Sequence, residues 1–208
     1  MNKAQWMAAV MRAAGEMPKY ERELCQLDTL VGDGDHGVTV SRGFRSVVQR
    51  ILVEETTELS DFCSRVGEVL AESMGGAIGP VYGLFWKEMA KAMQGGGDVT
   101  SQMMSRGMNG AVARIMRVCR VQPGEKTVLD AMLPCAQAME VGAQLPLEEM
   151  MALAADAARA GRDATRDMVA KKGRARFLAE KSLGHVDAGA SSFALFMQQW
   201  QSALGAKG

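Results

Sequence analysis

Apolar residues recur at helical spacing along almost the whole chain, and this pattern constrains the fold more than any other feature. Measured from Ile78, the residues Val81, Tyr82, Phe85 and Met89 follow at 3, 4, 7 and 11 positions, which places all five on one face of a helix. Similar stripes occur in residues 6–14, 60–70, 112–119, 128–139, 147–169 and 193–200. No segment sustains the two-residue alternation of a half-buried strand. The sequence therefore predicts an all-α domain of about eight helices.

Length, charge and cysteine usage narrow the class of protein. A chain of 208 residues fits one domain, which we expect to span residues 1–208. Its 24 basic and 24 acidic residues balance, so nothing in the net charge argues for nucleic acid or a membrane as a partner. No apolar run approaches the ~18 residues of a transmembrane helix. Cys25, Cys63, Cys119 and Cys135 are scattered without a CxxC pair, which favours reduced thiols and a cytoplasmic location.

Glycine and proline gather in short segments that also carry most of the reactive side chains. These segments are residues 32–37, 75–80, 123–127, 171–176 and 184–190. Loops that join rigid helices and concentrate polar groups are the usual place for a site. We therefore expect the segments to form a single nucleotide pocket at one end of the bundle.

The acidic loop, residues 27–37 (LDTLVGDGDHG), is the strongest of these signals. It brings Asp28, Asp33 and Asp35 around one glycine-rich bend, where each pair of carboxylates ~5 Å apart repels by roughly 3 kcal/mol at an effective dielectric constant of ~20. A hard divalent cation reverses that repulsion, and oxygen ligands favour Mg²⁺ over zinc. The alternative is a solvated turn that uses Asp and Gly for their turn chemistry.

Two familiar motifs do not fit this loop. Residues 32–37 match GxGxxG in letters, but two aspartates would face the pyrophosphate with like charge and no βαβ unit surrounds them. An EF-hand would need a glutamate eleven residues after Asp33, where Phe44 stands. The next helix is expected to begin near Val38. His36 then has three interpretations: a structural residue, a phosphate contact or a helix cap.

The two middle segments each have a binding and a packing interpretation. Residues 73–80 (SMGGAIGP) lead into a helix, where paired glycines and free amides suit a phosphate and Pro80 suits the first turn. They also suit a tight turn between packed helices. Residues 123–127 (PGEKT) lack the Walker A pattern, and Thr127 with Asp130 three residues later is typical of a helix cap.

The two C-terminal segments are ambiguous in the same way. Residues 171–176 (KKGRAR) are basic, and such runs usually form a solvated face. Residues 184–190 (GHVDAGA) are a second loop of Gly, His and Asp, and they also fit a turn with a helix cap.

Taken in order, the motifs resemble those of the nucleotide-binding L subunit of dihydroxyacetone kinases. They are GDGDHG at 32–37, GGAIGP at 75–80, PGEKT at 123–127 with Asp130, KGRA at 172–175 and GHVDAGA at 184–190. The likeness covers about residues 20–195. It implies an antiparallel, barrel-like bundle of eight helices that holds ADP or ATP at one end through two Mg²⁺ ions.

The resemblance also implies roles for individual residues. Asp28, Asp33 and Asp35 would be the metal ligands. The implied nucleotide-binding residues are His36, Gly37, Val38, Thr39, Ala77, Ile78, Cys119, Val128, Arg174, Asp187, Ala188 and Gly189. No catalytic residue is implied in this chain, because the family binds the small ketose on a histidine of a separate K subunit.

Several positions depart from the family pattern. The family commonly has serine where this chain has Ile78, methionine where it has Val128, proline where it has Ala188, and a Gly-Lys pair where it has Cys119 and Arg120. The implied metal ligands are unchanged, so we expect these departures to affect nucleotide affinity and turnover and not metal binding.

The resemblance implies a set of protein partners and leaves other functions open. The K subunit is the main partner, and in one branch a phosphotransferase-system M subunit rephosphorylates the resident nucleotide. A homodimer is a further option. One alternative function is a Mg–ADP-loaded regulatory protein that docks on a transcription regulator. Others are a divergent kinase subunit for another small ketose or polyol, and an Asp-cluster phosphohydrolase.

Overall fold

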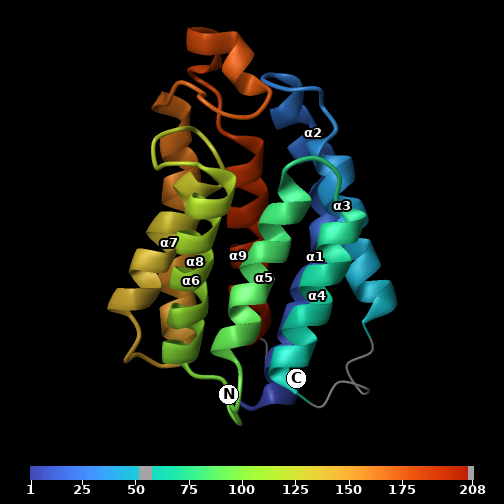
Figure 1. Ribbon diagram of the computed structural model, residues 1–208, viewed down its shortest axis with the longest axis vertical. Coiled ribbons are helices and arrows are strands. Elements are labelled where there is room, and N and C mark those ends of the chain that lie inside the picture. The colour runs from blue at the N-terminus through green and yellow to red at the C-terminus, as the bar shows by residue number, and fades with distance from the viewer. Residues whose placement is uncertain (52–57, 206–208) are drawn as a thin grey trace.

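The computed structural model describes residues 1–51 and 58–205, and within them all long regular elements are α-helices (Figure 1). The α-helices are α1 (Lys3–Glu16), α2 (Glu21–Thr29), α3 (His36–Arg50), α4 (Leu59–Ser73), α5 (Ile78–Ala92), α6 (Ser101–Cys119), α7 (Leu129–Val141), α8 (Leu147–Ala164) and α9 (Ala188–Gly205). Short 3₁₀ turns span Met17–Tyr20, Thr165–Asp167 and Ala175–Ser182. The described residues contain no β-strand, and the prediction of an all-α chain is confirmed.

The helices form a closed ring. From α3 to α9 each helix packs against the next one along the chain, and α1 packs against both α9 and α3. Because α1, the turn Met17–Tyr20 and α2 follow one another without a break, they act as one bent member of the ring. The nine α-helices of the described residues therefore make an eight-membered barrel, as the resemblance implied.

The up-and-down order of the helices decides where the loops lie. Successive members of the ring run in opposite directions, so every second connection falls at the same end (Figure 1). The connections at the upper end in Figure 1 are residues 30–35, 74–77, 120–128 and 165–187. These are the glycine-rich segments of the sequence, and the topology alone brings them together.

Aromatic side chains fill the interior of the barrel. Trp6, Trp86 and Trp200 are fully buried, and their ring centroids lie 5.4–6.5 Å from one another. Phe196 stacks on Phe44 at 5.1 Å and continues the cluster along the barrel. Each buried ring contributes roughly 1.5–3 kcal/mol by leaving water, with edge-to-face contacts adding to it. This packed core is a rigid base for the loops above it.

Two helix boundaries differ from the sequence prediction. The helix expected near Val38 begins at His36, because the carboxylate of Asp28 accepts a hydrogen bond from the His36 amide at 3.2 Å and satisfies the helix end. That cap comes from eight residues earlier in the chain. The long stripe over residues 147–169 ends as a helix at Ala164 and continues as a 3₁₀ turn.

No helix in the described parts of the chain is long and apolar enough to cross a membrane.

Candidate functional site

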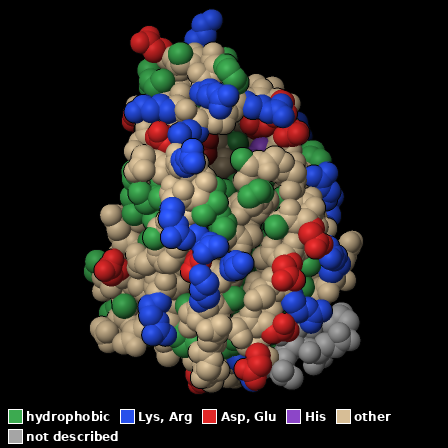
Figure 2. Space-filling model, in the orientation of Figure 1, with side chains coloured by type: hydrophobic (Ala, Val, Ile, Leu, Met, Phe, Trp, Pro, Cys, Tyr) green, Lys and Arg blue, Asp and Glu red, His purple; other side chains and the backbone are tan. Residues whose placement is uncertain are grey.

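The four loops at the upper end of the barrel enclose a cavity of about 580 Å³. Figure 2 shows it as a hollow bordered by basic side chains, with acidic side chains and a histidine at its edge. The predicted site residues that line it are Asp28, Asp33, Asp35, His36, Val38, Thr39, Ala77, Ile78, Cys119, Val128, Arg174, Asp187, Ala188 and Gly189. Gly37 is the one predicted site residue outside the lining. Residues far apart in sequence thus meet around one cavity.

The acidic loop is a tight bend between α2 and α3. Asp28 lies in the last turn of α2, and its carbonyl accepts hydrogen bonds from the amides of Val31 and Gly32 at 3.0 and 2.5 Å. Gly34 takes a positive φ of 79°, which a glycine adopts without steric cost. The bend therefore folds the carboxylates of residues 33 and 35 back toward Asp28.

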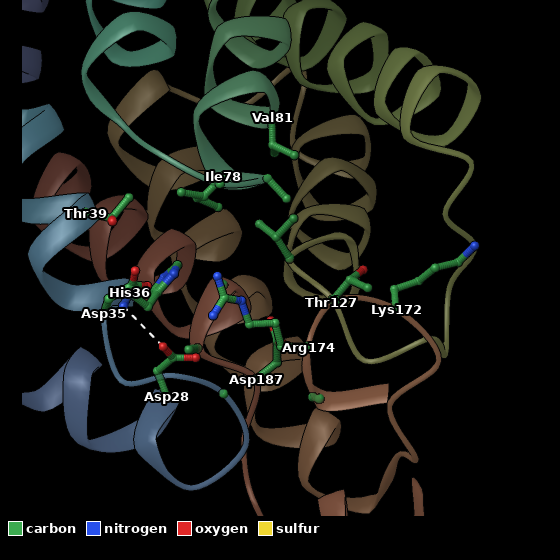
Figure 3. Close-up of a pocket in the computed structure, with 18 of the residues that line it drawn as sticks. Asp28, Asp35, His36, Thr39, Ile78, Val81, Thr127, Lys172, Arg174 and Asp187 are labelled. Atoms are coloured by element: carbon green, nitrogen blue, oxygen red, sulfur yellow. Dashed lines mark hydrogen bonds between the residues drawn. The ribbon is translucent and has the colours of Figure 1, made fainter. Parts of the chain in front are cut away.

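Asp28, Asp33 and Asp35 each present a carboxylate oxygen within 4.8 Å of the other two. Three acidic oxygens at this spacing suit a shared hard cation, because they repel one another unless a positive charge lies between them. One such charge is the guanidinium of Arg174, which forms an ion pair with Asp33. In Figure 3 Arg174 reaches into the cavity toward the acidic loop, and Lys172 points away from it.

His36 joins α3 to α9 beside the acidic loop. Its Nε2 lies 3.0 Å from the hydroxyl of Ser192, and its ring is also hydrogen-bonded to the backbone of Ala188. Burial lowers the pKa of His36, although the carboxylates of Asp28 and Asp35 oppose that shift. A neutral imidazole held by two helices fits the structural interpretation, and its edge still lines the cavity.

Gly37 faces α2 and not the cavity. A Cβ atom at this position would overlap the carbonyl oxygen of Glu21 and lie 2.8 Å from the amide nitrogen of Cys25. The glycine therefore lets α3 approach α2 closely, and that approach holds the two ends of the acidic loop at their present spacing.

Four helices begin at the cavity. The first residues or N-caps of α3, α5, α7 and α9 are His36, Ile78, Val128 and Ala188, and all four line it. The unpaired amides and the positive dipole end of a helix attract anions. An anionic group in the cavity thus meets helix N-termini from four directions, because alternate members of an up-and-down barrel start at the same end.

The loop of residues 120–128 is fixed by side-chain hydrogen bonds of Thr127 and Asp130. The hydroxyl of Thr127 accepts the Leu129 amide at 3.2 Å, and the carboxylate of Asp130 accepts the Thr127 amide at 2.8 Å. The second oxygen of Asp130 accepts the Gly124 amide at 2.6 Å. The sequence predicted Thr127 as the N-cap of α7, but the structure places the N-cap one residue later, at Val128. The hydrogen bonds of Thr127 and Asp130 still tie the loop to the start of α7.

Comparison with known proteins agrees with this geometry. The family model described as the DAK2 domain matches residues 30–202. This chain belongs to the DAK2 domain family. The match begins in the acidic loop and ends in α9, so it includes the lining of the cavity from Val31 to Gly189.

Two relatives and one solved structure show which kinds of kinase this DAK2 domain is similar to. It is 34% identical over 181 residues to the ADP-binding subunit DhaL of the PEP-dependent dihydroxyacetone kinase of Escherichia coli K12, with 84% of each chain covered. It is 30% identical over 208 residues to an L-erythrulose kinase of Pectobacterium atrosepticum, covering 97% of this chain and 35% of that one. The dihydroxyacetone kinase of C. freundii, solved in complex with AMP-PNP and Mg²⁺, shares the fold with a TM-score of 0.72, 23% identity, and coverage of 97% of this chain and 34% of its own.

Sequence reasoning missed several lining residues of the DAK2 domain. Arg42 lies one turn after Thr39 on α3, and its Nε donates to the Ser73 carbonyl at 2.7 Å at the cavity mouth. Val81 and Ile115 form an apolar wall deeper in the barrel (Figure 3 shows Val81 beyond Ile78). Helical spacing from the predicted residues would have found Arg42 and Val81. Ile115 belongs to a core stripe, and nothing in its sequence context distinguishes it.

Asp187 is a partly buried carboxylate in the lining of the DAK2 domain cavity, and its raised pKa predicts a pH dependence of stability. Its carboxylate accepts the Ala190 amide at 2.7 Å. Burial raises the pKa of Asp187 to about 6, and the nearby carboxylates of Asp130 and Asp28 add smaller contributions in the same direction. The hydrogen bond from Ala190 and the positive charge of Lys126 lower the pKa but do not cancel this shift. Between pH 4 and pH 6 the folded chain therefore holds a proton on Asp187 that the unfolded chain has lost. The contribution of this proton to the free energy of unfolding is complete below pH 4 and is lost as the pH rises through 6.

The variant Asp187→Asn removes this ionisation and keeps an oxygen for the Ala190 amide. We expect its free energy of unfolding at pH 7, without metal or nucleotide, to exceed that of the wild type by about 2 kcal/mol, and the gain to vanish below pH 4. Urea unfolding at several pH values measures both. Asp156→Asn, at an exposed position of α8, is the control and should follow the wild-type profile. If the free energies of unfolding of Asp187→Asn and the wild type change in parallel with pH, the pKa of Asp187 is not raised in the folded chain.

Proposed function

We propose that this chain is the nucleotide-binding subunit of a dihydroxyacetone-type kinase, and that residues 1–208 form one domain for that purpose. ADP or ATP would lie in the cavity, with Asp28, Asp33 and Asp35 as ligands of two Mg²⁺ ions. The observation that carries the proposal is the meeting of three carboxylates, an arginine and four helix N-termini around one cavity. Cations and phosphates need these opposite environments side by side.

The residues of the chain would act by binding and orientation. The acidic loop would hold the metal ions, and the amides at the start of α5 and α9 would face the phosphates. Bound Mg²⁺ supplies positive charge to a transferring phosphoryl group. The apolar wall of Ile78, Val81 and Ile115 would exclude water on the inner side of the cavity. Phosphoryl transfer of this kind depends mainly on positioning and electrostatics.

The acceptor and the source of the phosphoryl group would lie on other proteins. The E. coli relative is the ADP-binding subunit of a PEP-dependent kinase, which supports a K subunit that holds dihydroxyacetone and an M subunit that rephosphorylates the nucleotide. The Pectobacterium relative supports a second candidate substrate, the four-carbon ketose L-erythrulose. Ile78 at the start of α5 brings no hydroxyl to the phosphates, so backbone amides would bind them there.

The test is transfer to a ketose in a reconstituted system. The purified chain, loaded with ATP and Mg²⁺ and mixed with a K subunit, should phosphorylate dihydroxyacetone, and a parallel reaction with L-erythrulose decides between the two substrates. The control omits the K subunit and should give no sugar phosphate. Hydrolysis of phosphoesters by the chain alone, with no transfer to either ketose, would contradict the proposal and favour a phosphohydrolase.

A further inference from the structure

Lys126 is a buried lysine in the lining of the cavity, with 2% of its surface exposed. Its Nζ donates to the backbone carbonyls of Thr165 at 2.7 Å, Met168 at 3.1 Å, Ser182 at 2.8 Å and His185 at 2.5 Å. A protonated amine has three N–H groups, so four carbonyls share three donors. All four acceptors are neutral oxygens, and they surround the charge with the negative ends of peptide dipoles.

The four carbonyls belong to the two ends of a single loop. We call residues 169–181 the rim loop. Thr165 and Met168 precede it, and Ser182 and His185 follow it. The ammonium of Lys126 therefore joins the segment that enters the rim loop to the segment that leaves it, in the manner of a clamp at the base of the loop.

Apart from Lys126, most contacts that hold the rim loop lie at its two ends. The Gly184 amide donates to the Arg166 carbonyl at 2.9 Å, and the Asp187 amide donates to the Thr165 hydroxyl at 2.8 Å. Within the loop, Lys172 forms an ion pair with Glu125 at 3.8 Å.

Two further hydrogen bonds involve residues at or beside the ends of the loop. The Ser182 hydroxyl accepts the Ala170 amide at 2.9 Å, and the Lys171 amide donates to the Glu125 carbonyl at 3.1 Å. Both contacts lie at the ends of the loop, beside the clamp. Farther out the loop is largely exposed, and Phe177 has 77% of its surface in solvent. A loop without its own core takes its position from the points at which it is anchored.

The rim loop carries part of the cavity wall. Gly173 and Arg174 line the cavity, and Arg174 reaches across it to Asp33. A shift of the loop by an ångström or two at its base would move the guanidinium relative to the acidic loop. The backbone of Lys126 itself lies in the left-handed region at φ 60°, which residues with a side chain seldom adopt. The contacts of its side chain hold it there.

We propose that Lys126 is a positioning residue whose buried charge clamps the two ends of the rim loop and so fixes where Arg174 meets the phosphates of a bound nucleotide. The identity of that ligand rests on the proposed function. The clamp itself rests on the four hydrogen bonds and the burial of Lys126, so the two claims are tested separately.

The first test compares Lys126→Met, which keeps most of the length of the side chain and removes its charge, with Lys181→Met, a change at an exposed lysine of the same loop. Without nucleotide, we expect amide hydrogen exchange in residues 169–181 to become about 10-fold faster or more in Lys126→Met and to stay unchanged in Lys181→Met. Calorimetric titration should show Mg·ADP bound about 10-fold more weakly by Lys126→Met alone. Wild-type exchange and affinity in Lys126→Met would overturn the proposal.

Chemical rescue separates charge from packing. Lys126→Ala lacks three carbons and the amine, which n-propylammonium replaces. Added propylammonium should slow the exchange of residues 169–181 and restore Mg·ADP affinity, whereas 1-propanol, of similar size and neutral, should do neither. Equal rescue by both compounds would show that Lys126 only fills space and would overturn the clamp.

A measurement on the wild-type chain covers the case in which the variants fail to fold. With ¹⁵N-labelled lysine, the Nζ of Lys126 should give a protonated signal at neutral pH whose hydrogens exchange slowly, because all of them are engaged with carbonyls. Rapid exchange at this amine would overturn the proposal. Failure of the wild type to bind Mg·ADP would instead reject the proposed function and leave the exchange data to decide on the clamp.

Discussion

Asp33→Asn is expected to weaken Mg²⁺-dependent ADP binding by about 100-fold or more, because an amide oxygen replaces one of the three clustered carboxylates that we propose as ligands of Mg²⁺. The fold should survive. Asp33 is exposed and forms an ion pair with Arg174, whose side chain is 70% exposed. Loss of this exposed ion pair lowers the free energy of unfolding by about 1 kcal/mol at most. Calorimetric titration of ADP with and without Mg²⁺ measures the change in affinity.

The matched control for this experiment is Asp98→Asn. Asp98 is an exposed aspartate in the connection before α6, at the opposite end of the barrel. This variant carries the same charge change and should bind Mg·ADP as the wild type does. If Asp33→Asn also keeps the wild-type affinity, the acidic loop is a solvated turn and does not bind the metal.

Gly37→Ala is expected to lower the free energy of unfolding by about 3 kcal/mol, because the added methyl overlaps backbone atoms of α2 that cannot rotate away. For a chain of this length that loss corresponds to a Tm lower by roughly 9 °C. Thermal unfolding followed by circular dichroism measures it. Because α2 must move to relieve the overlap, Mg·ADP affinity should fall as well.

Gly15→Ala provides a control with the opposite sign. Gly15 lies in the last turn of α1, and an added Cβ there would meet no atom within 4 Å. Alanine in an open helical position is favoured over glycine by about 0.5–1 kcal/mol, so this variant should be as stable as the wild type or more so. Equal stability of the two variants would show that close approach of α2 and α3 at Gly37 does not matter.

Much of the fold was predictable because helical periodicity depends on local sequence. The stripe from Ile78 to Met89 matches the buried face of α5, and the glycine-rich segments match the loops of the upper end. Once the helices are consecutive and antiparallel, alternate loops meet at one end. The cavity lining could be anticipated from the sequence for that reason, and the family motifs pointed to the same residues.

The parts that were not predictable depend on contacts between distant residues. The start of α3 is fixed by Asp28 from the preceding helix, and the packing role of Gly37 requires knowing which face of α3 meets α2. Lys126 lies in a motif that the sequence singled out, yet its carbonyl partners lie 39–59 residues away. No local pattern encodes such pairs, because they form only when the loops are brought together.

Native mass spectrometry of the gently purified chain, with and without a chelator, tests the metal-bridged nucleotide cavity most directly. We expect an added mass that matches ADP plus two magnesium ions and is lost on chelation. The same mass appearing only after ATP or ADP and Mg²⁺ are added would mean that the nucleotide exchanges freely and would still support the cavity. A chain that binds neither nucleotide nor Mg²⁺ under any of these conditions would contradict the account.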